Sequence, residues 1–353
     1  MSDQSYLAIR NGAGIRSRTS RGIIAVGGAD RADYLQGLLT NDIAGLGAGE
    51  GCYAAYLTPQ GRLVTDMEVL NVGDLILLDL DRSVTPSLVA RLEELVFTED
   101  VTVTDWSDHR TGYSVDGPAA LTTVATALSD CGATPVLVSD TRDLGTHRGL
   151  GATVGGEAVV VTRTDELGIL GVVLLVVPGQ AMRVYEALVS AGAVEVDPET
   201  AEVVRIESGR PAFPADLDTE TIPLEAGIED RAISLTKGCY VGQEVIIRVL
   251  HRGEGRVARR LVGLTLDDVG KGDASTGAVP DPGAQLWRDG RQVGRITSAA
   301  VSPALQKVVA LGYVAREMTA PGTRVEVDLG AGGLRQAVVT PTPFVAAGYD
   351  DVQ

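Results

Sequence analysis

Cys239 is the residue of this chain whose neighbours most suggest reactive chemistry. It lies in the stretch TKGCYVGQE (residues 236–244), next but one to Lys237 and between two glycines. The thiolate is the nucleophilic form of cysteine, and a nearby cation such as Lys237 favours it. A helix starting near Val241, with Gln243 in its first turn, would direct N–H groups toward the sulfur. The residue types leave two interpretations open, a functional thiol or a half-buried structural cysteine.

Glu207 is a second candidate. Asp197 and Pro198 predict the start of a helix, and Gly209 predicts its end, so Glu207 falls in the last turn. The helix dipole disfavours an anion there. Glu207 is therefore either a solvent-exposed glutamate or a carboxylate that binds a ligand with paired N–H donors, as a pterin ring has.

Composition excludes several other classes of function. The chain has 353 residues and a formal net charge of −17, which disfavours binding to a nucleic-acid backbone. Its three cysteines and three histidines have no disulfide or metal-ligand spacing. The N-terminal residues lack the apolar region of a signal peptide, and no apolar run is long enough to span a membrane. We expect a cytoplasmic protein without a protein-built metal site.

The order of apolar and turn-forming segments predicts an α+β protein followed by a β domain. Strands are expected at 22–27, 52–57, 63–70, 75–80 and 101–105, with helices after Asp30 and after Pro86. A second unit repeats this alternation, with helices over 119–128 and 180–191 and strands over 158–163 and 171–177. In the second of these helices we expect Met182, Tyr185, Leu188 and Val189 to face inward.

Short strands separated by turn residues then predict a small barrel or sandwich, at 285–287, 293–296, 308–313, 324–327 and 336–340. We place the domain boundary near residue 258. The first domain, 1–257, divides into subdomains of about 1–115 and 116–257, and the second covers 258–353. Arginines cluster just around the boundary, either as a solvated loop face or as an anion contact: Arg252, Arg256, Arg259 and Arg260.

Several segments resemble one known family. RIESGRPAFPADLDTETIPLEAGIEDRAISLTKGCYVGQEVIIR (residues 205–248) resembles the YgfZ-type folate-binding proteins, a branch of the superfamily that contains the glycine-cleavage aminomethyltransferase, or T-protein. DRADYLQGLLTNDI (30–43), SPALQKVVALGYVARE (302–317) and TPTPFV (340–345) extend the likeness over almost the whole chain. KGCYxGQE is the most specific of these motifs.

The resemblance implies a cloverleaf of two mixed α/β, ferredoxin-like units and a C-terminal β-barrel around a central cavity for tetrahydrofolate. It implies that Glu207 binds the pterin, that Tyr53 lines the folate cavity and that Cys239 and Lys237 form the functional motif. Members of the YgfZ branch support the assembly or repair of iron–sulfur enzymes, which would be the protein partners.

Two departures from the aminomethyltransferases affect the choice of function. Those enzymes usually carry Asp-Asp where this chain has Thr65-Asp66, so Thr65 replaces their first acid, and Gln243 replaces an arginine. Because side chains alternate along a strand, we expect Asp66 to face away from the position that Thr65 occupies. The first hypothesis is therefore a folate-binding accessory protein with a reactive Cys239. The alternative is a folate-dependent aminomethyltransferase in which Asp66 contributes to the site.

Overall fold

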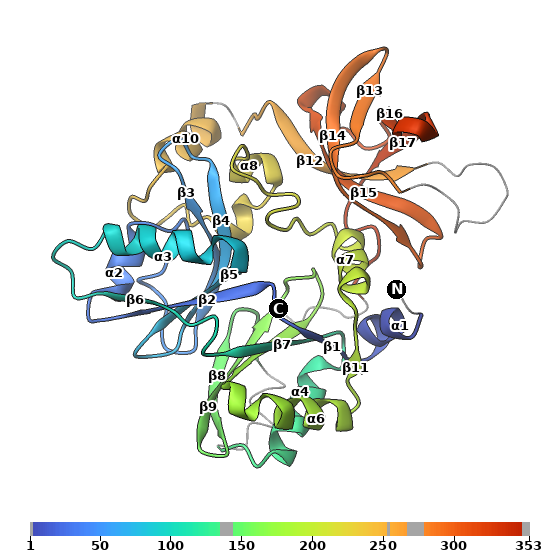
Figure 1. The fold of residues 1–353 in the computed structure, drawn as a ribbon. Coiled ribbons are helices and arrows are strands. Elements are labelled where there is room, and N and C mark those ends of the chain that lie inside the picture. Colours follow the sequence, from blue (N-terminus) through green and yellow to red (C-terminus); the bar gives the residue numbers. More distant parts are fainter. Residues whose placement is uncertain (1–2, 135–143, 253–254, 267–278, 348–353) are drawn as a thin grey trace.

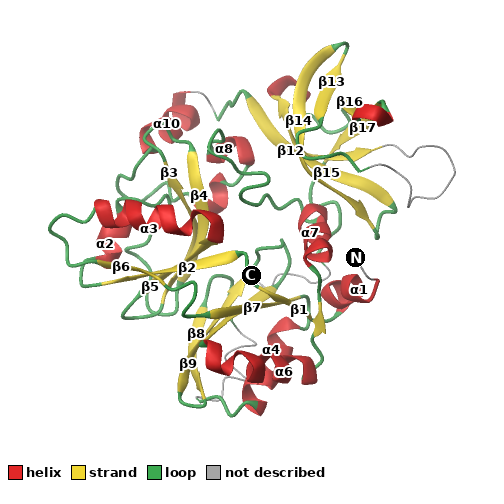
Figure 2. Ribbon diagram, in the orientation of Figure 1, coloured by secondary structure: helices red, strands yellow, loops and turns green. Residues whose placement is uncertain are grey.

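The computed structural model describes residues 3–134, 144–252, 255–266 and 279–347. The chain forms three lobes around a common centre (Figure 1), and Figure 2 shows that two of them mix helices with strands while the third is nearly all strand. We call them the first lobe, the second lobe and the barrel. No helix within the described ranges is long and apolar enough to cross a lipid bilayer.

The first lobe is a five-stranded antiparallel sheet with helices on one face. Its strand order is β3-β4-β5-β2-β6. Leu35 from one helix and Leu88 and Leu92 from the other pack against Ile24 and Met67 of the sheet. The elements are β2 (Arg21–Gly27), α2 (Arg31–Gln36), β3 (Gly51–Leu57), β4 (Leu63–Asn71), β5 (Ile76–Asp81), η1 (Arg82–Val84), α3 (Thr85–Glu94) and β6 (Thr102–Asp105).

The second lobe is a six-stranded sheet of order β11-β1-β7-β10-β9-β8. Two helices cover one face, and Val124 and Leu128 from α4 and Val184 and Leu188 from α6 enter the same apolar core. The elements are α1 (Asp3–Asn11), β1 (Gly14–Ser17), β7 (Thr111–Asp116), α4 (Ala120–Asp130), β8 (Gly149–Val154), β9 (Glu157–Thr164), β10 (Gly171–Val176), η2 (Pro178–Gln180), α6 (Ala181–Ser190) and β11 (Val194–Glu195).

Two expectations about these lobes need correction. Strand β1 precedes the first lobe in sequence but pairs with β7 and β11 in the second sheet, so the sheets do not divide the chain near residue 115. In α6, Met182 is 66% exposed and Val189 is 43% exposed, whereas Val184 and Leu188 are buried. Packing of α6 against α4 turns Val184 and Leu188 inward and leaves Met182 and Val189 on the outer side.

The barrel closes in the order β12-β15-β14-β13-β16-β17. Alternate residues such as Leu264, Leu266, Val325 and Val327 fill its interior, as the period of two requires. The predicted strands are therefore confirmed, and a further strand precedes them. The elements are β12 (Arg259–Leu266), β13 (Gln285–Arg288), β14 (Arg291–Ser302), β15 (Lys307–Ala315), η5 (Arg316–Met318), β16 (Arg324–Asp328), η6 (Gly330–Gly332) and β17 (Leu334–Thr340).

Helix α7 (Pro198–Glu207) connects the second lobe to the barrel. The Asp197 carboxylate accepts a hydrogen bond from the N–H of Thr200 at 2.7 Å, and Gly209 ends the helix with a φ of 69°. Both local predictions are thus confirmed. Val203 and Ile206 of α7 pack against the barrel strands β14 and β15.

The segment after α7 covers part of the first lobe. It contains α8 (Pro223–Ala226), α9 (Glu229–Ala232), α10 (Gln243–Ile247) and the π-helical turn η3 (Arg248–Arg252). Leu217, Leu224 and Ile228 pack against Ala55 and Leu57 of β3, on the sheet face opposite α2 and α3. The rest of that face borders a cavity.

Candidate functional site

A cavity of about 570 Å³ lies where the two N-terminal lobes meet α7 and the segment that follows it. Both sheets contribute to its wall, which carries many ionisable side chains of both signs. Its acids and arginines are Asp66, Glu68, Asp81, Glu166, Glu195, Asp197, Glu202, Arg16, Arg21, Arg205, Arg210 and Arg231. Such a volume suits a small organic ligand with several polar groups.

Tyr53 and Asp66 form the most directed polar pair in this wall. They come from the neighbouring strands β3 and β4, and the Tyr53 hydroxyl donates to Oδ2 of Asp66 at 2.6 Å. Asp66 is only 7% exposed, and its other oxygen, Oδ1, is buried with no hydrogen-bond partner among the described residues. A buried acceptor without a donor is costly, so this oxygen is suited to a ligand N–H or O–H.

The alternation of side chains along β4 determines whether Thr65 or Asp66 faces the cavity. Met67 and Val69 pack against α2 and α3, so the odd-numbered residues face the helices and Asp66 and Glu68 face the cavity. The hydroxyl of Thr65 donates to the backbone oxygen of Asp66 instead. The expectation that Thr65 holds the cavity position is therefore wrong. The structure presents a carboxylate there.

The environment of this pair keeps one partner a donor and the other an acceptor. Burial raises the pKa of Asp66, while the charge of Arg21 and the Tyr53 hydrogen bond act in the opposite direction. Burial and the nearby Asp66 charge raise the pKa of Tyr53 well above 10. The phenol therefore stays protonated at neutral pH and can donate to Asp66.

Two arginines that the sequence did not single out complete this side of the cavity. The Arg231 guanidinium lies 4.5 Å from the centre of the Tyr53 ring and donates to Asp165 at 2.7 Å. Arg210 pairs with the same carboxylate. Arg210 and Arg231 share the single carboxylate of Asp165, so a net positive charge remains that an anionic group of a ligand can pair with. Both arginines lie inside the segment that carries the family resemblance, which is the signal that could have identified them.

Glu68 connects the first lobe to a loop of the second. Its carboxylate lies 2.8 Å from Nδ1 of His147. Burial alone would lower the pKa of His147, but the hydrogen bond and charge of Glu68 outweigh burial and raise it. Glu68, which lines the cavity, therefore favours the protonated form of the His147 imidazole. Sequence reasoning missed this pair because Glu68 is in the first lobe and His147 is in a loop of the second lobe.

Glu207 is not where we expected it. Its side chain is fully buried and is not among the described residues that line the cavity. The Tyr6 hydroxyl lies 2.8 and 3.0 Å from its two oxygens, and Arg10 and Ser302 also donate to the carboxylate. Its backbone oxygen accepts from Phe344. The residue joins α1, α7 and the barrel, and these donors offset the unfavourable helix dipole.

The Lys237 ammonium is directed at backbone oxygens of the first lobe. It donates to the backbone oxygens of Gln36, Leu39 and Asn41 at 2.7, 2.6 and 2.8 Å. All three donor hydrogens are thereby directed at the turn after α2. The contacts of Lys237 therefore differ from the thiol pairing that the sequence suggested, and its effect on Cys239 stays a prediction.

Cys239 and Gln243 also lie away from the central cavity. Cys239 is exposed, whereas Cys131 is buried and Cys52 is partly buried. The Gln243 amide is 3.5 Å from the oxygen of Gly238. Neither side chain is among the described residues that line the cavity. No residue of the motif 236–244 is among the described residues that line the cavity, although Tyr240 belongs to the same apolar cluster as Tyr53.

The sequence also matches known protein families. Residues 1–237 match the GCVT N-terminal domain, and residues 259–346 match the glycine cleavage T-protein C-terminal barrel domain. The chain belongs to this family. These matches do not distinguish the YgfZ branch from the aminomethyltransferases within the superfamily.

Individual relatives agree with this membership. An aminomethyltransferase of Nostoc is 28% identical over 97% of this chain and 87% of its own length. A putative chloroplastic transferase of Arabidopsis thaliana is 29% identical over 98% of this chain and 74% of its own. The crystal structure of the glycine cleavage aminomethyltransferase of Bartonella henselae has a TM-score of 0.83 at 23% identity, covering 98% of this chain and 90% of that one. This last likeness concerns the fold.

The placement of Glu207 predicts a structural role that a conservative variant can measure. Glu207→Gln leaves Arg10 without its buried counter-charge, so we expect a loss of about 3–5 kcal/mol in the free energy of unfolding. Urea unfolding measures the loss. The control is Glu186→Gln on the exposed side of α6, which should change stability by less than about 0.5 kcal/mol. Unchanged stability in Glu207→Gln would contradict the structural role.

The three cysteines should differ in reactivity because they differ in exposure. Burial raises the pKa of Cys52 to about 12 and raises that of Cys131, so Cys239 should be alkylated at least about tenfold faster at pH 7.5. Mass spectrometry of a time course with iodoacetamide gives the three rates. The Lys237→Met variant should keep the Cys239 rate within about twofold. A large decrease would show that the lysine activates the thiol after all.

The Glu68–His147 pair predicts a pH-dependent contribution to stability. Because Glu68 raises the pKa of His147, its stabilisation is complete below the unfolded-state value of 6.5 and is lost as pH rises through the folded-state value. Glu68→Gln should therefore cost about 1.5 kcal/mol more at pH 6 than at pH 9. Urea midpoints at both pH values test this, with exposed Glu157→Gln as the control. Equal costs at the two pH values would refute it.

Proposed function

We propose that this protein is a folate-dependent one-carbon transferase: in the central cavity the carbon of a donor's aminomethyl group passes to tetrahydrofolate, and the amino group leaves as ammonia. Membership of the glycine-cleavage T-protein family and the aminomethyltransferase relatives support this proposal. The observation that carries it is the buried Asp66 carboxylate on the cavity wall, with one oxygen held by Tyr53 and the other without a hydrogen-bond partner in the part of the chain that the structure describes. The sequence, with Thr65 in place of the first acid of the aminomethyltransferases, predicted that the cavity has no such acid and thus favoured an accessory role.

The residues of the cavity fit a folate. The free oxygen of Asp66 can accept a hydrogen bond from an amine or a ring N–H. Arg231 and Tyr53 offer a cation and an aromatic ring close together, and Arg210 has a buried Nε without a hydrogen-bond partner among the described residues. A carboxylate of the ligand can pair with these guanidinium groups. Tetrahydrofolate would supply the nitrogen atoms that accept the one-carbon unit.

Asp66 can act on the charge of the reacting amine. In a site that excludes water, a carboxylate stabilises a nearby ammonium or iminium cation more strongly than it would in water. Its raised pKa also brings it closer to the range in which it can exchange a proton with the substrate. Tyr53 holds Oδ2 in place, so that Oδ1 remains the atom directed at the substrate. Glu207 has no part in this scheme.

Removal of the Asp66 charge is the direct test. Asp66→Asn should lower kcat about 10²–10⁴-fold, because the amide neither stabilises a cation nor accepts a proton. Incubation with an aminomethyl donor and tetrahydrofolate, with mass detection of methylene-tetrahydrofolate, measures the transfer. The matched control is Thr65→Val, whose side chain faces the helices and which should retain activity within about threefold. Full activity in Asp66→Asn would refute the proposal.

The exposed thiol of Cys239 favours a second candidate, an accessory protein for iron–sulfur enzymes of the YgfZ type. In this case the thiol contacts client proteins at the surface, and the cavity serves only to bind folate. Complementation of a deletion strain, scored by the activity of iron–sulfur enzymes, separates the two. Loss of function in Cys239→Ser but not in Asp66→Asn supports the accessory role, and the reverse result supports transfer.

A further inference from the structure

An apolar pocket, which we call the slot, opens between the sheets of the first and second lobes, on the faces that carry no helices. Its volume is about 640 Å³, larger than that of the central cavity, and the two spaces share no described residue. Strands β4 and β5 form one wall and β8 and β9 the other, and the aliphatic side chains that line it are Leu70, Val72, Leu75, Leu77, Leu150 and Val160. Binding sites for small molecules usually have this size and an apolar lining.

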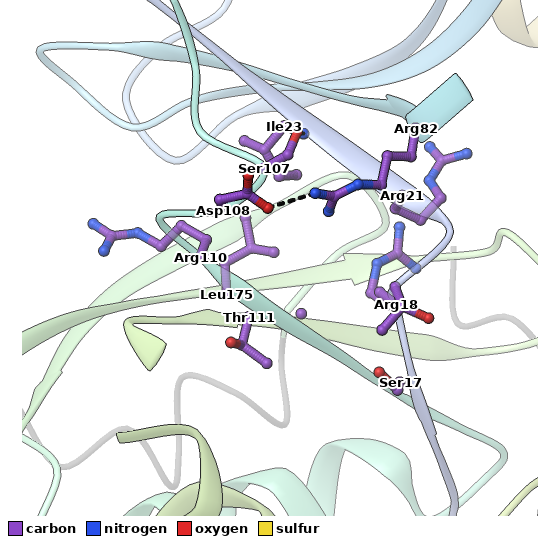
Figure 3. Close-up of a pocket in the computed structure, with 12 residues that line it drawn as sticks. Ser17, Arg18, Arg21, Ile23, Arg82, Ser107, Asp108, Arg110, Thr111 and Leu175 are labelled. Carbon is purple, nitrogen blue, oxygen red and sulfur yellow. Dashed lines mark hydrogen bonds and ion pairs between the residues drawn. The ribbon is translucent and has the colours of Figure 1, made fainter. Parts of the chain in front are cut away.

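Beside the slot, side chains fill the space between the two sheets. Ile23, Ala25 and Leu77 of the first sheet and Val173 and Leu175 of the second form one buried apolar cluster. Figure 3 labels one residue from each side of this cluster, Ile23 and Leu175. Leu77 belongs both to the cluster and to the wall of the slot. The slot is therefore the continuation of a packed interface into a part that no side chain fills.

A glycine of β8 keeps this part open. Leu175, Val160 and Gly151 lie opposite one another on β10, β9 and β8, so they form one row on the face toward the first lobe. Along this row the side chain shortens from a buried leucine to none at all. A Cβ added at Gly151 would meet no heavy atom of the described chain within 4 Å. The row thus leaves room for a ligand where a larger residue would have completed the interface.

The length of the slot suits an extended chain rather than a compact group. Residues 149–153 of β8 border it and span about 13 Å at about 3.3 Å per residue, the length of an extended chain of about ten carbons. The hydroxyls of Thr134 and Thr153, which also line the slot, are 2.7 Å apart and satisfy each other. The walls therefore offer a chain apolar contact along most of this length.

One cation borders the slot. The Arg110 guanidinium lies 5.0 Å from the centre of the Trp106 ring, and both residues line the slot. The ring orients the cation without neutralising it. Figure 3 shows Arg110 extending away from the Arg82–Asp108 pair, and within the described ranges no acid forms an ion pair with it, the lining residue Asp74 included. A single unpaired guanidinium at an otherwise apolar site favours a ligand with one carboxylate.

We propose that the slot binds a medium-chain aliphatic carboxylate, with its chain between the two sheets and its head group on Arg110. The apolar walls select the chain, and the unpaired guanidinium selects the charge. An aromatic acid would favour facing aromatic rings, and Trp106 is the one aromatic side chain among the described lining residues. The inference does not rest on folate binding, because the slot and the central cavity have separate walls.

Titration with decanoate tests the proposal. Trp106 and Trp287 are the only tryptophans of the sequence, so in a Trp287→Phe background the fluorescence of Trp106 reports on the slot. We expect saturable binding, and calorimetry on the wild-type protein should give one decanoate per chain. Octanoate should bind about tenfold more weakly because it buries two methylene groups fewer. Decanol should also bind at least about tenfold more weakly, because it lacks the charge that Arg110 recognises.

Two variants separate the chain from the head group. Gly151→Val places a side chain in the slot, so decanoate should bind at least about tenfold more weakly while the urea midpoint of unfolding does not fall. In Arg110→Gln, decanoate should bind no more than about threefold more tightly than decanol. The matched control is Arg291→Gln, an exposed arginine on the barrel, which should keep the wild-type affinity.

Several results would overturn the assignment. They are the absence of saturable binding to the wild type, equal affinity for octanoate and decanoate, and full affinity in a folded Gly151→Val variant. A wild-type preference for decanoate over decanol that survives in Arg110→Gln would also overturn it, whatever Gly151→Val does to stability. Sedimentation tests the other occupant that an apolar slot could take. A wild-type dimer that Gly151→Val dissociates would show that a second copy of the chain fills the slot in place of a carboxylate.

Discussion

The buried carboxylate of Glu207 is the interaction on which the arrangement of this molecule depends. A charge removed from water must be met by donors, and here Tyr6, Arg10 and Ser302 supply them from α1 and the barrel. The same residue accepts two backbone N–H groups through its main-chain oxygen. The end of α7 is thereby fixed to three other parts of the chain. Since α7 also contributes to the cavity wall, the shape of the cavity follows from this junction.

A second constraint, the two-residue period of β4, gives the cavity its chemistry. Met67 and Val69 must face the helices of the first lobe, and this requirement turns Asp66 and Glu68 the other way. Each of the two acids then meets a different partner, Tyr53 within the same sheet and His147 from the second lobe. The packing of Met67 and Val69 against the helices therefore determines the position of the candidate reactive acid, Asp66, and also the Glu68–His147 contact between the lobes.

Long-range partners explain where sequence reasoning succeeded and where it did not. The start and end of α7 follow from Asp197, Pro198 and Gly209, which act within a few residues, and the barrel strands follow from local alternation. Glu207 and Tyr6 are 201 positions apart, as are Lys237 and Gln36. Neither pairing has a local signature. For that reason a helix-end glutamate was predicted to bind a ligand, and a half-buried lysine was predicted to activate a thiol.

The amino-acid sequence by itself determined the family, the helices and strands of the first lobe and five of the six barrel strands, because capping residues, turns and hydrophobic periods act over short distances. Only the tertiary structure decided which carboxylate faces the cavity, that Cys239 stands apart from it, and that arginines from separate elements meet there. The physical reason is that the direction of a side chain depends on what packs against the other face of its element. That packing is supplied by segments far away in the chain.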